Sequence, residues 1–406
     1  MLIGINVTAA VKQPRTGVEE YTYQLIKHLT MLPEAREHRF LLYLPAPKSD
    51  ADIRIHANDT NKYFDFDLPQ NFEIKILKWP LSVLWTQIRL AWEMLRRPPE
   101  ILLIPVHILP FFHPKNSVVT IHGLEYEYFP KYYPWRHRLY LRWSTKYALK
   151  HTRKIIAISE NTKRDLIKLY GGKRSKIEMV HHGIEIQKSK IKSHNDFGHS
   201  EAVGRGISHE CGINISRIRE RFLASLGMTG KKPYLLYLGR SEQKKNIEGI
   251  LEAYKILKEK YQIPHQLVLA GSPGFGYDNL KLKVRHLLEI KELGYIDEDT
   301  KWRLFRDTDV FLFPSFYEGF GLPILEAQAT RAPIVTSDNS CLREIAGEGA
   351  LFVNPKDPAQ IAEAVKSIID DNVLRGRLVA AGSENLKRFG WEKCARETLK
   401  ILADLS

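Results

Sequence analysis

One junction between a strand and a helix organises the second half of the chain: Phe313-Pro314-Ser315-Phe316-Tyr317-Glu318-Gly319-Phe320-Gly321-Leu322-Pro323-Ile324-Leu325-Glu326-Ala327. The apolar run 309–313 that leads into it is typical of a buried strand. Gly319 and Gly321 permit the backbone angles of a tight turn, and Pro323 suits the first turn of a helix. The stretch therefore predicts a strand, a glycine-rich turn and a helix.

This junction also has the features of an anion-binding site. Free backbone N–H groups and the positive end of a helix converge there. Two carboxylates bracket the turn: Glu318 lies on it, and Glu326 lies about one helical turn or more into the helix. Because carboxylates repel phosphate, we expect them to accept hydrogen bonds from hydroxyl groups. Phosphate beside hydroxyls indicates a nucleotide-sugar; the alternative is an ordinary turn with one solvated glutamate.

Apolar strands and amphipathic helices alternate along most of the chain. The expected strands are 2–7, 40–44, 72–77, 101–104, 117–121, 154–158, 176–180, 234–238, 266–270, 309–313, 333–336 and 350–353. The expected helices include 18–31, 84–96, 136–150, 160–170, 215–226, 247–261, one ending near 289, 299–307, 358–370, 373–389 and 391–405. This alternation predicts an α/β protein with parallel sheets covered on both faces.

The length of 406 residues predicts two domains. Residues 186–216 are rich in Lys, Ser, His, Gly and Asn and lack apolar periodicity, which indicates a linker or insertion. We expect a first domain at 1–185 and a second at 217–390, with the final helix, 391–406, able to pack back on the first. Both are expected to be doubly wound, Rossmann-like domains that face one cleft, with ligands beyond the carboxyl ends of their strands.

Composition indicates the cellular compartment and the class of binding partner. The formal charge of +14 indicates an anionic partner: a lipid headgroup, a nucleic acid or a substrate phosphate. Three scattered cysteines, Cys211, Cys341 and Cys394, form no disulfide framework, so we expect a reducing compartment. The segment Met1–Val7 reads as a strand rather than a signal peptide, and no apolar run approaches the roughly 18 residues of a membrane span. We therefore expect a cytoplasmic protein.

Basic residues follow a strand of the second domain. Arg240 and Lys245 lie in the turn after 234–238, at the carboxyl end of that strand, where Arg can bind a diphosphate with a bidentate fork. The alternative is a pair of solvated cations. In the first domain, His122 ends the apolar run 117–121, and Gly17 precedes the first helix. Both have an ordinary structural alternative. His122 could be a structural histidine whose hydrogen bonds are made within the protein, and Gly17 could be a glycine at the start of a helix.

These motifs resemble, in order and over nearly the whole chain, those of the family 4 retaining glycosyltransferases, which have the GT-B fold. The two glutamates around Gly-Phe-Gly-Leu-Pro resemble that family's glutamate pair, and Leu-Gly-Arg followed by Lys-Asn resembles its diphosphate-binding segment. Val-Thr-Ile-His-Gly-Leu is similar to its His-Asp-Leu motif, although Gly123 replaces the usual Asp. Arg-Thr-Gly-Val-Glu matches its glycine loop, while His182-Gly183-Ile184-Glu185 resembles a turn that we interpret as structural.

The resemblance implies transfer of a hexose-type sugar, with retained anomeric configuration, from a nucleoside-diphosphate sugar to a glycan or lipid-linked acceptor in cell-surface polysaccharide or glycolipid synthesis. It implies no metal and no cofactor, an acceptor-binding first domain and a donor-binding second domain. Catalytic roles fall to His122, Arg240, Lys245 and Glu318. Substrate-binding roles fall to Gly17, Gly319, Phe320, Gly321, Leu322 and Glu326. Backbone N–H groups of 319–322 and the two cations would stabilise the leaving diphosphate.

The segment Lys131–Lys154 contains eight Lys or Arg and six Tyr or Trp residues and no acidic residue. Its helix could lie on an anionic membrane, at the inner face of the plasma membrane, or its aromatic side chains could belong to the core.

Two further functions compete with glycosyl transfer. A nucleic-acid-binding protein would explain the charge, but no zinc knuckle, helix-turn-helix or RNP-type motif accompanies it. A GT-B-like nucleotide-sugar epimerase or phosphorylase is disfavoured by the Gly-Phe-Gly-Leu turn with its two glutamates.

Overall fold

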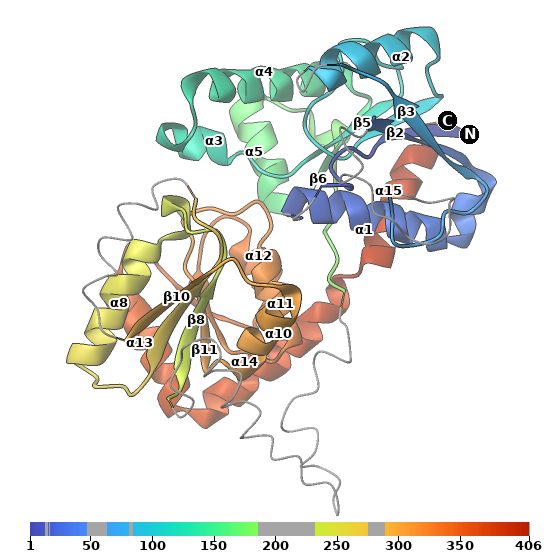
Figure 1. Cartoon of the computed structure of the whole chain (residues 1–406). Coiled ribbons are helices and arrows are strands. Elements are labelled where there is room, and N and C mark those ends of the chain that lie inside the picture. Colours follow the sequence, from blue (N-terminus) through green and yellow to red (C-terminus); the bar gives the residue numbers. More distant parts are fainter. Residues whose placement is uncertain are drawn as a thin grey trace, which may run out of the picture. The chain divides into compact units, whose positions relative to one another are not determined.

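The computed structural model describes residues 1–12, 15, 17–46, 63–80, 84–185, 232–274 and 289–405 (Figure 1). The chain separates into two compact units, one formed by Met1–Glu185 with Phe389–Ser406 and the other by Ile186–Arg388. Each unit contains one parallel sheet, so the predicted pair of α/β sheets is confirmed. The expected linker 186–216 and the expected helix 215–226 lie outside the described residues.

The N-terminal unit is built on a seven-stranded sheet of order β3-β2-β1-β4-β5-β6-β7, with all neighbours parallel. Its strands are β1 (Leu2–Asn6), β2 (Arg39–Pro45), β3 (Phe72–Leu77), β4 (Ile101–Ile104), β5 (Ser117–Ile121), β6 (Lys154–Ala157) and β7 (Ile177–Met179). β4 and β5 are buried along their whole length because helices cover both faces of the sheet. The strand order reverses between β1 and β4, which creates a switch point.

Helices on both faces complete this unit. They are α1 (Gly17–Met31), the π-helix η3 (Trp85–Leu90), α2 (Ala91–Arg96), α3 (Glu125–Tyr128), α4 (Trp135–His151), α5 (Glu160–Tyr170) and α15 (Trp391–Ala403), with short 3₁₀ turns η1 (Pro33–Glu37), η4 (Pro130–Tyr132) and η5 (Arg174–Lys176). The expected helix 84–96 thus begins as a π-helix.

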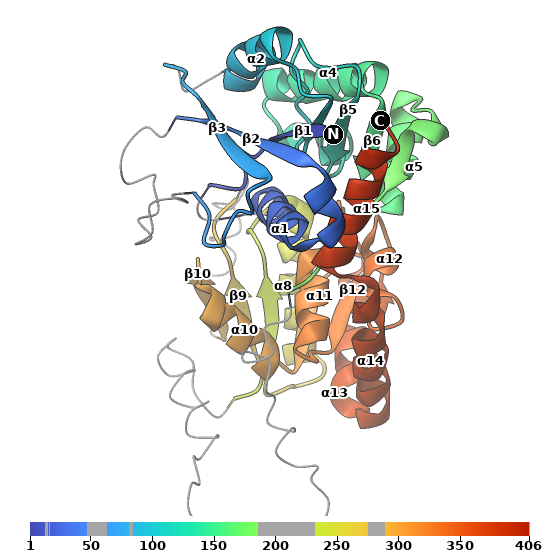
Figure 2. The ribbon, with the colours of Figure 1, turned by 90° about the vertical axis from the view of Figure 1, so that its right-hand side faces the viewer.

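The C-terminal helix α15 lies beside α1 (Figure 2). Its apolar face buries Cys394, Leu399 and Leu402 in the same core as the α1 side chains. The chain passes close to this helix at Gly183, where an added Cβ would lie 2.1 Å from the backbone nitrogen of Trp391. Only glycine fits there, which agrees with a structural role for the 182–185 turn.

The second unit contains a six-stranded parallel sheet of order β10-β9-β8-β11-β12-β13. Its strands are β8 (Tyr234–Leu238), β9 (Gln266–Ala270), β10 (Ile290–Gly294), β11 (Val310–Phe313), β12 (Ile334–Ser337) and β13 (Leu351–Val353). Its helices are α8 (Ile247–Glu259), α10 (Glu298–Asp307), α11 (Leu322–Ala329), α12 (Leu342–Ala346), α13 (Pro358–Asp370) and α14 (Asn372–Asn385), with 3₁₀ turns η7 (Gln243–Lys245) and η8 (Leu386–Arg388). The order reverses between β8 and β11, so a second switch point lies there.

Two elements of this unit differ from the expectations. The edge strand β10 was not predicted, because it is short, mixes charged and apolar residues and is only half-buried along its length. The short helix α12 was also not predicted. The helix expected to end near 289 lies outside the described residues up to 288.

Candidate functional site

The predicted strand, turn and helix around residues 313–327 are present. β11 ends at Phe313 and α11 begins at Leu322, with Gly321 as its N-cap residue at φ 101°. This left-handed backbone favours glycine, and an added Cβ would also press against Leu342 at 3.2 Å. Pro323 lies in the first helical turn, as predicted. The turn 314–321 and the start of α11 therefore lie beyond the carboxyl end of β11.

Lys245 and Glu318 meet at this turn. The Nζ atom of Lys245 lies 2.5 Å from Oε1 of Glu318, and the two side chains are only 15% and 11% exposed. Lys245 ends η7, which follows β8, and β8 and β11 are neighbours in the sheet. Because carboxyl ends of parallel strands share one edge, the two loops meet at the switch point. The structure thus joins a predicted phosphate-binding cation to a predicted hydroxyl-binding carboxylate.

Asn246 holds the same two loops together. Its Nδ2 donates hydrogen bonds to the carbonyl oxygens of Pro314 (3.1 Å) and Pro355 (2.6 Å), while its Oδ1 caps α8 by accepting from Gly249 N–H. The backbone N–H of Phe316 donates to the carbonyl of Lys244 at 2.8 Å. Sequence reasoning missed Asn246; its position directly before the apolar helix 247–261 was the available signal.

The loop after β12 braces the turn from the other side. The backbone N–H of Glu318 donates to Ser340 Oγ at 3.1 Å. The Cys341 thiol shares its one proton between the carbonyl oxygens of Glu318 and Phe320, at Sγ–O distances of 3.2 and 3.0 Å. Burial raises the pKa of the Cys341 thiol well above its ordinary value, so the thiol keeps its proton and remains a donor. Sequence reasoning used Cys341 only to infer the compartment and missed this contact.

Glu326 has a cation partner of its own. Its Oε1 lies 2.7 Å from Nζ of Lys301 on α10, and both side chains are about 15% exposed (15% and 16%). Burial alone would lower the pKa of Lys301, but the carboxylates of Glu326 and Glu298 outweigh burial and raise that pKa. Lys301 therefore keeps its charge, and its contact with Oε1 fixes the direction of the Glu326 carboxylate. Lys301 was not predicted, because nothing in its neighbourhood distinguishes it from other surface lysines.

Arg240 lies on the same turn as Lys245 but differs in exposure. Its side chain is 60% exposed, with Nε 3.4 Å from Glu242 Oε1. Its backbone carbonyl accepts a hydrogen bond from the buried Tyr237 hydroxyl at 2.8 Å. The backbone is therefore anchored while the guanidinium remains accessible to an anion.

His122 and Gly17 belong to the N-terminal unit. His122 directly follows β5, and its Nε2 lies 2.7 Å from the carbonyl oxygen of Pro105. Burial lowers the pKa of His122 to about 4, so its imidazole is neutral near pH 7 and Nε2 donates its proton to that carbonyl. Gly17 starts α1, and an added Cβ would meet no atom within 4 Å. Packing against the described residues does not require glycine there, although a ligand could.

The described residues contain no group of three or more His, Cys, Asp or Glu side chains that could hold a metal ion. Within the same part of the chain, no helix has both the length and the apolar character needed to cross a membrane. The roles of the ten predicted site residues toward a ligand stay predictions.

Comparisons with known proteins identify the class. The family profile described as "Glycosyltransferase Family 4" matches residues 15–188, and the profile "Glycosyl transferases group 1" matches residues 218–385. The chain belongs to the family 4 glycosyltransferases, so the predicted resemblance is confirmed and the protein is a glycosyltransferase.

Individual relatives agree with this assignment. The chain is 28% identical to the O-antigen chain mannosyltransferase B of Escherichia coli over 404 residues, which cover 97% of this chain and 98% of that protein. It is 30% identical over 208 residues to a phosphatidyl-myo-inositol mannosyltransferase of Mycobacterium leprae (strain TN), covering 50% and 54% of the two chains. The solved structure of sucrose-phosphate synthase from Thermosynechococcus elongatus superposes with a TM-score of 0.70 at 18% identity, covering 100% of this chain and 98% of that one. The fold is GT-B, as predicted.

Proposed function

We propose that this enzyme transfers a mannosyl residue from a nucleoside-diphosphate sugar to a glycan or lipid-linked acceptor, with retained anomeric configuration and without a metal ion. The observation that carries the proposal is the Lys245–Glu318 pair beside the 319–322 turn. It places a cation, a carboxylate and a helix N-terminus at one sheet edge. The choice of mannose is supported by the names of three relatives, each of which is a mannosyltransferase.

The cation pair and the turn serve the diphosphate. When a donor binds, its phosphates replace Glu318 as the ion-pair partner of Lys245. The accessible guanidinium of Arg240 then donates bidentate hydrogen bonds to the phosphates. Backbone N–H groups at the start of α11 and the helix dipole add further stabilisation. All three act on the negative charge that develops on the leaving nucleoside diphosphate, so they lower the barrier to cleavage of the sugar–phosphate bond.

The carboxylates serve the hydroxyl groups. Release from Lys245 frees Glu318 to accept hydrogen bonds from the sugar. Glu326, which is held by Lys301, accepts hydrogen bonds from the ribose hydroxyls. Neither glutamate acts as the acid or nucleophile of a glycosidase in this proposal, because Glu326 serves the ribose and that chemistry requires two carboxyl groups flanking one glycosidic bond.

Two residues of the N-terminal unit have ligand roles of their own in this proposal. The neutral imidazole of His122 contacts the donor sugar near the bond that breaks. Gly17, which has open space where a side chain would extend, lets the start of α1 approach the donor phosphate or the acceptor.

A panel of sugar nucleotides tests this function. Mannose and glucose nucleotides of guanosine, uridine and adenosine are compared by thermal shift, because a ligand that binds only the folded state raises the melting temperature. We expect one mannose nucleotide to stabilise the enzyme most and to release its nucleoside diphosphate only when an acceptor glycan is present. Release without an acceptor, or interconversion of the sugar, would favour hydrolysis or epimerisation instead. Unchanged transfer in the presence of EDTA, with a retained anomeric centre by NMR, is also expected.

A further inference from the structure

The N-terminal unit exposes a group of large apolar side chains on η3, α2, α4 and the segment between β4 and β5. We call this group the docking face. Its members are Leu84, Ile88, Trp92, Leu95, Phe111, Phe112, Trp135, Leu139 and Trp143, which are 38% to 67% exposed. Single exposed apolar residues are common on protein surfaces, but a contiguous group of this kind marks an interaction site.

Contacts within the unit join these elements into one surface. The ring of Phe111 lies 5.4 Å from that of Trp143 on α4, and the hydroxyl of Tyr147 donates to the carbonyl of Phe111 at 2.9 Å. From η3, the side chain of Gln87 accepts from Phe111 N–H at 3.1 Å and donates to the carbonyl of Leu109 at 3.0 Å. The segment that carries Phe111 and Phe112 is thus fixed between η3 and α4. Figures 1 and 2 both show α2 and α4 on the same side of the sheet.

The outer side of α4 combines apolar and basic residues. Trp135, Leu139 and Trp143 follow one another at four-residue spacing, so they share one side of the helix. Three basic residues, Arg142, Lys146 and Lys150, fall on that same side, while Leu141, Ser144, Thr145 and Ala148 face the core. Trp135 is 67% exposed, so the alternative that the aromatic residues of 131–154 belong to the core is wrong for this one.

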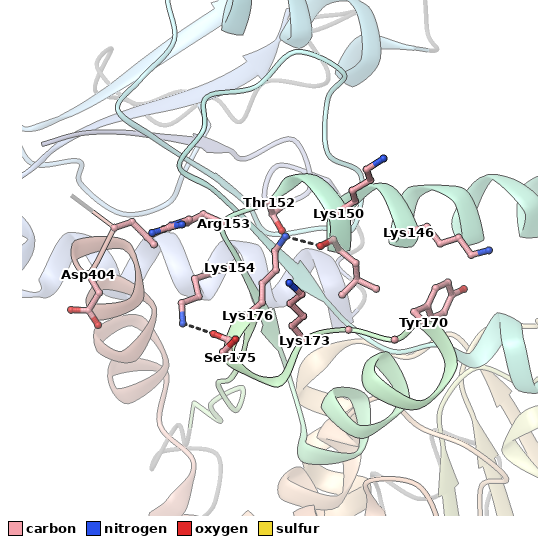
Figure 3. Close-up of a pocket in the computed structure, with 14 residues that line it drawn as sticks. Lys146, Lys150, Thr152, Arg153, Lys154, Tyr170, Lys173, Ser175, Lys176 and Asp404 are labelled. Atoms are coloured by element: carbon pink, nitrogen blue, oxygen red, sulfur yellow. Dashed lines mark hydrogen bonds between the residues drawn. The ribbon is translucent and has the colours of Figure 1, made fainter.

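A basic cavity lies at the C-terminal end of α4 (Figure 3). It has a volume of about 810 Å³, and its basic lining residues are Lys146, Lys150, Arg153, Lys154, Lys173 and Lys176. Asp404 is the single acidic residue among the described residues that line it. Two of the lysines are fixed by the protein: Lys176 Nζ donates to the Leu149 carbonyl at 2.6 Å, and Lys154 pairs with Glu178.

The cavity carries uncompensated positive charge. Among the described residues, six basic side chains and one carboxylate line it. Burial, and then the neighbouring charges of Lys173 and Arg153, lower the pKa of Lys176. An anion in the cavity would offset this excess of positive charge. Lys146 and Lys150 line the cavity and also lie on the outer side of α4, so the cavity and the docking face adjoin.

We propose that the docking face binds the surface of a bilayer that contains anionic lipids, with a headgroup phosphate in the basic cavity. The exposed Trp and Phe rings suit the boundary between headgroups and acyl chains, and the leucine and isoleucine side chains enter the apolar layer. Lysines beside them attract anionic headgroups. A nucleic acid matches this face less well, because Leu84, Ile88 and Leu95 provide no ring on which a base could stack.

Vesicle flotation tests the proposal on the full-length enzyme. Phosphatidylcholine vesicles with and without phosphatidylglycerol are compared, without donor or acceptor, so the result does not depend on the proposed transferase activity. We expect binding only to the anionic vesicles, with loss of binding at high salt. The variant Lys146→Glu/Lys150→Glu should weaken binding roughly tenfold or more, and Phe112→Ser/Trp135→Ser should weaken it by a comparable factor.

The control is Lys168→Glu/Lys356→Glu, which makes the same change of charge at two exposed lysines outside the cavity lining. It should bind vesicles more tightly than the Lys146→Glu/Lys150→Glu variant. Equal weakening in both double variants would show a non-specific charge effect and overturn the site. Absence of vesicle binding, or tighter binding to duplex DNA that the docking-face variants also lose, would likewise overturn it. Inorganic phosphate is titrated against both proteins as a further probe. If it binds the wild-type enzyme but not Lys146→Glu/Lys150→Glu, while that variant still binds vesicles, the cavity takes free phosphate rather than a headgroup.

Discussion

Lys245 and Glu318 lie 73 residues apart in the sequence, yet their side chains form a 2.5 Å ion pair between the loops that follow β8 and β11. Without a donor, the two side chains form an ion pair with one another in a turn where both are largely buried. In the proposed mechanism, a diphosphate that arrives at this edge competes with Glu318 for Lys245, and the released carboxylate becomes available to hydroxyl groups. In this proposal, one contact links binding of the phosphates to binding of the sugar.

Arg240→Ala should weaken donor binding without affecting the free energy of unfolding. The guanidinium is 60% exposed, and its partner Glu242 also pairs with Lys244 at 3.5 Å, so removal of the guanidinium leaves no buried carboxylate without a cation. Loss of one charge-assisted hydrogen-bonding group should raise the donor Kd about tenfold. Isothermal titration calorimetry measures the Kd and urea unfolding measures stability. Lys244→Ala, a change in the same turn, is the matched control and should have a smaller effect on Kd; equal effects would remove Arg240 from the site.

Glu326→Gln should weaken binding of the nucleoside diphosphate itself. The substitution removes the charge that pairs with Lys301 and halves the capacity to accept ribose hydrogen bonds. We expect about a tenfold increase in Kd. Glu298→Gln offers a close comparison, because Glu298 also pairs with Lys301 but is 68% exposed. If both substitutions change Kd equally, the ribose role of Glu326 is wrong.

Gly321→Ala and Gly17→Ala should differ in their effect on stability. At Gly321 the φ of 101° and the nearby Leu342 make a side chain unfavourable, so we expect a loss of about 1–2 kcal/mol in the free energy of unfolding. At Gly17 an added methyl group meets open space, so stability should hold while transfer falls. Urea denaturation and a transfer assay measure the two quantities. Full activity in Gly17→Ala would argue against ligand approach at the start of α1.

Stability should fall as the pH drops below about 6.5. Burial lowers the pKa of folded His122 from its ordinary value of 6.5 to about 4, so between these values the unfolded chain binds the proton and the folded chain does not. The folded state therefore loses stability on acidification, by about 1–2 kcal/mol at pH 5 from this residue. Urea unfolding at pH 5 and 7.5 measures the loss, which His122→Asn should reduce. An unchanged pH dependence in that variant would show that His122 titrates normally.

Local patterns in the sequence were sufficient for the strand, turn and helix around Gly321, because glycine, proline and apolar residues act within a few positions of one another. The parallel sheets followed from the alternation of strands and helices. The contacts of Ser340, Cys341, Asn246 and Lys301 could not be predicted in the same way. Each depends on segments far apart in the sequence that the fold brings together, and local periodicity does not determine the order of the strands. The exposure of Trp135 also could not be predicted from the sequence, because a helix with interleaved basic and aromatic residues can pack either face against the core.

Binding of a nucleoside diphosphate to Lys245→Ala tests the central claim most directly. Isothermal titration calorimetry on the wild-type enzyme should show saturable binding of a nucleoside diphosphate. The nucleotide is the one whose sugar derivative gives the largest shift in melting temperature. The variant should lose this binding at least a hundredfold, because its diphosphate would face the Glu318 carboxylate without a buried cation beside it. Urea unfolding should show that the variant remains folded. Undiminished affinity in a folded Lys245→Ala protein would contradict the account and place the diphosphate elsewhere.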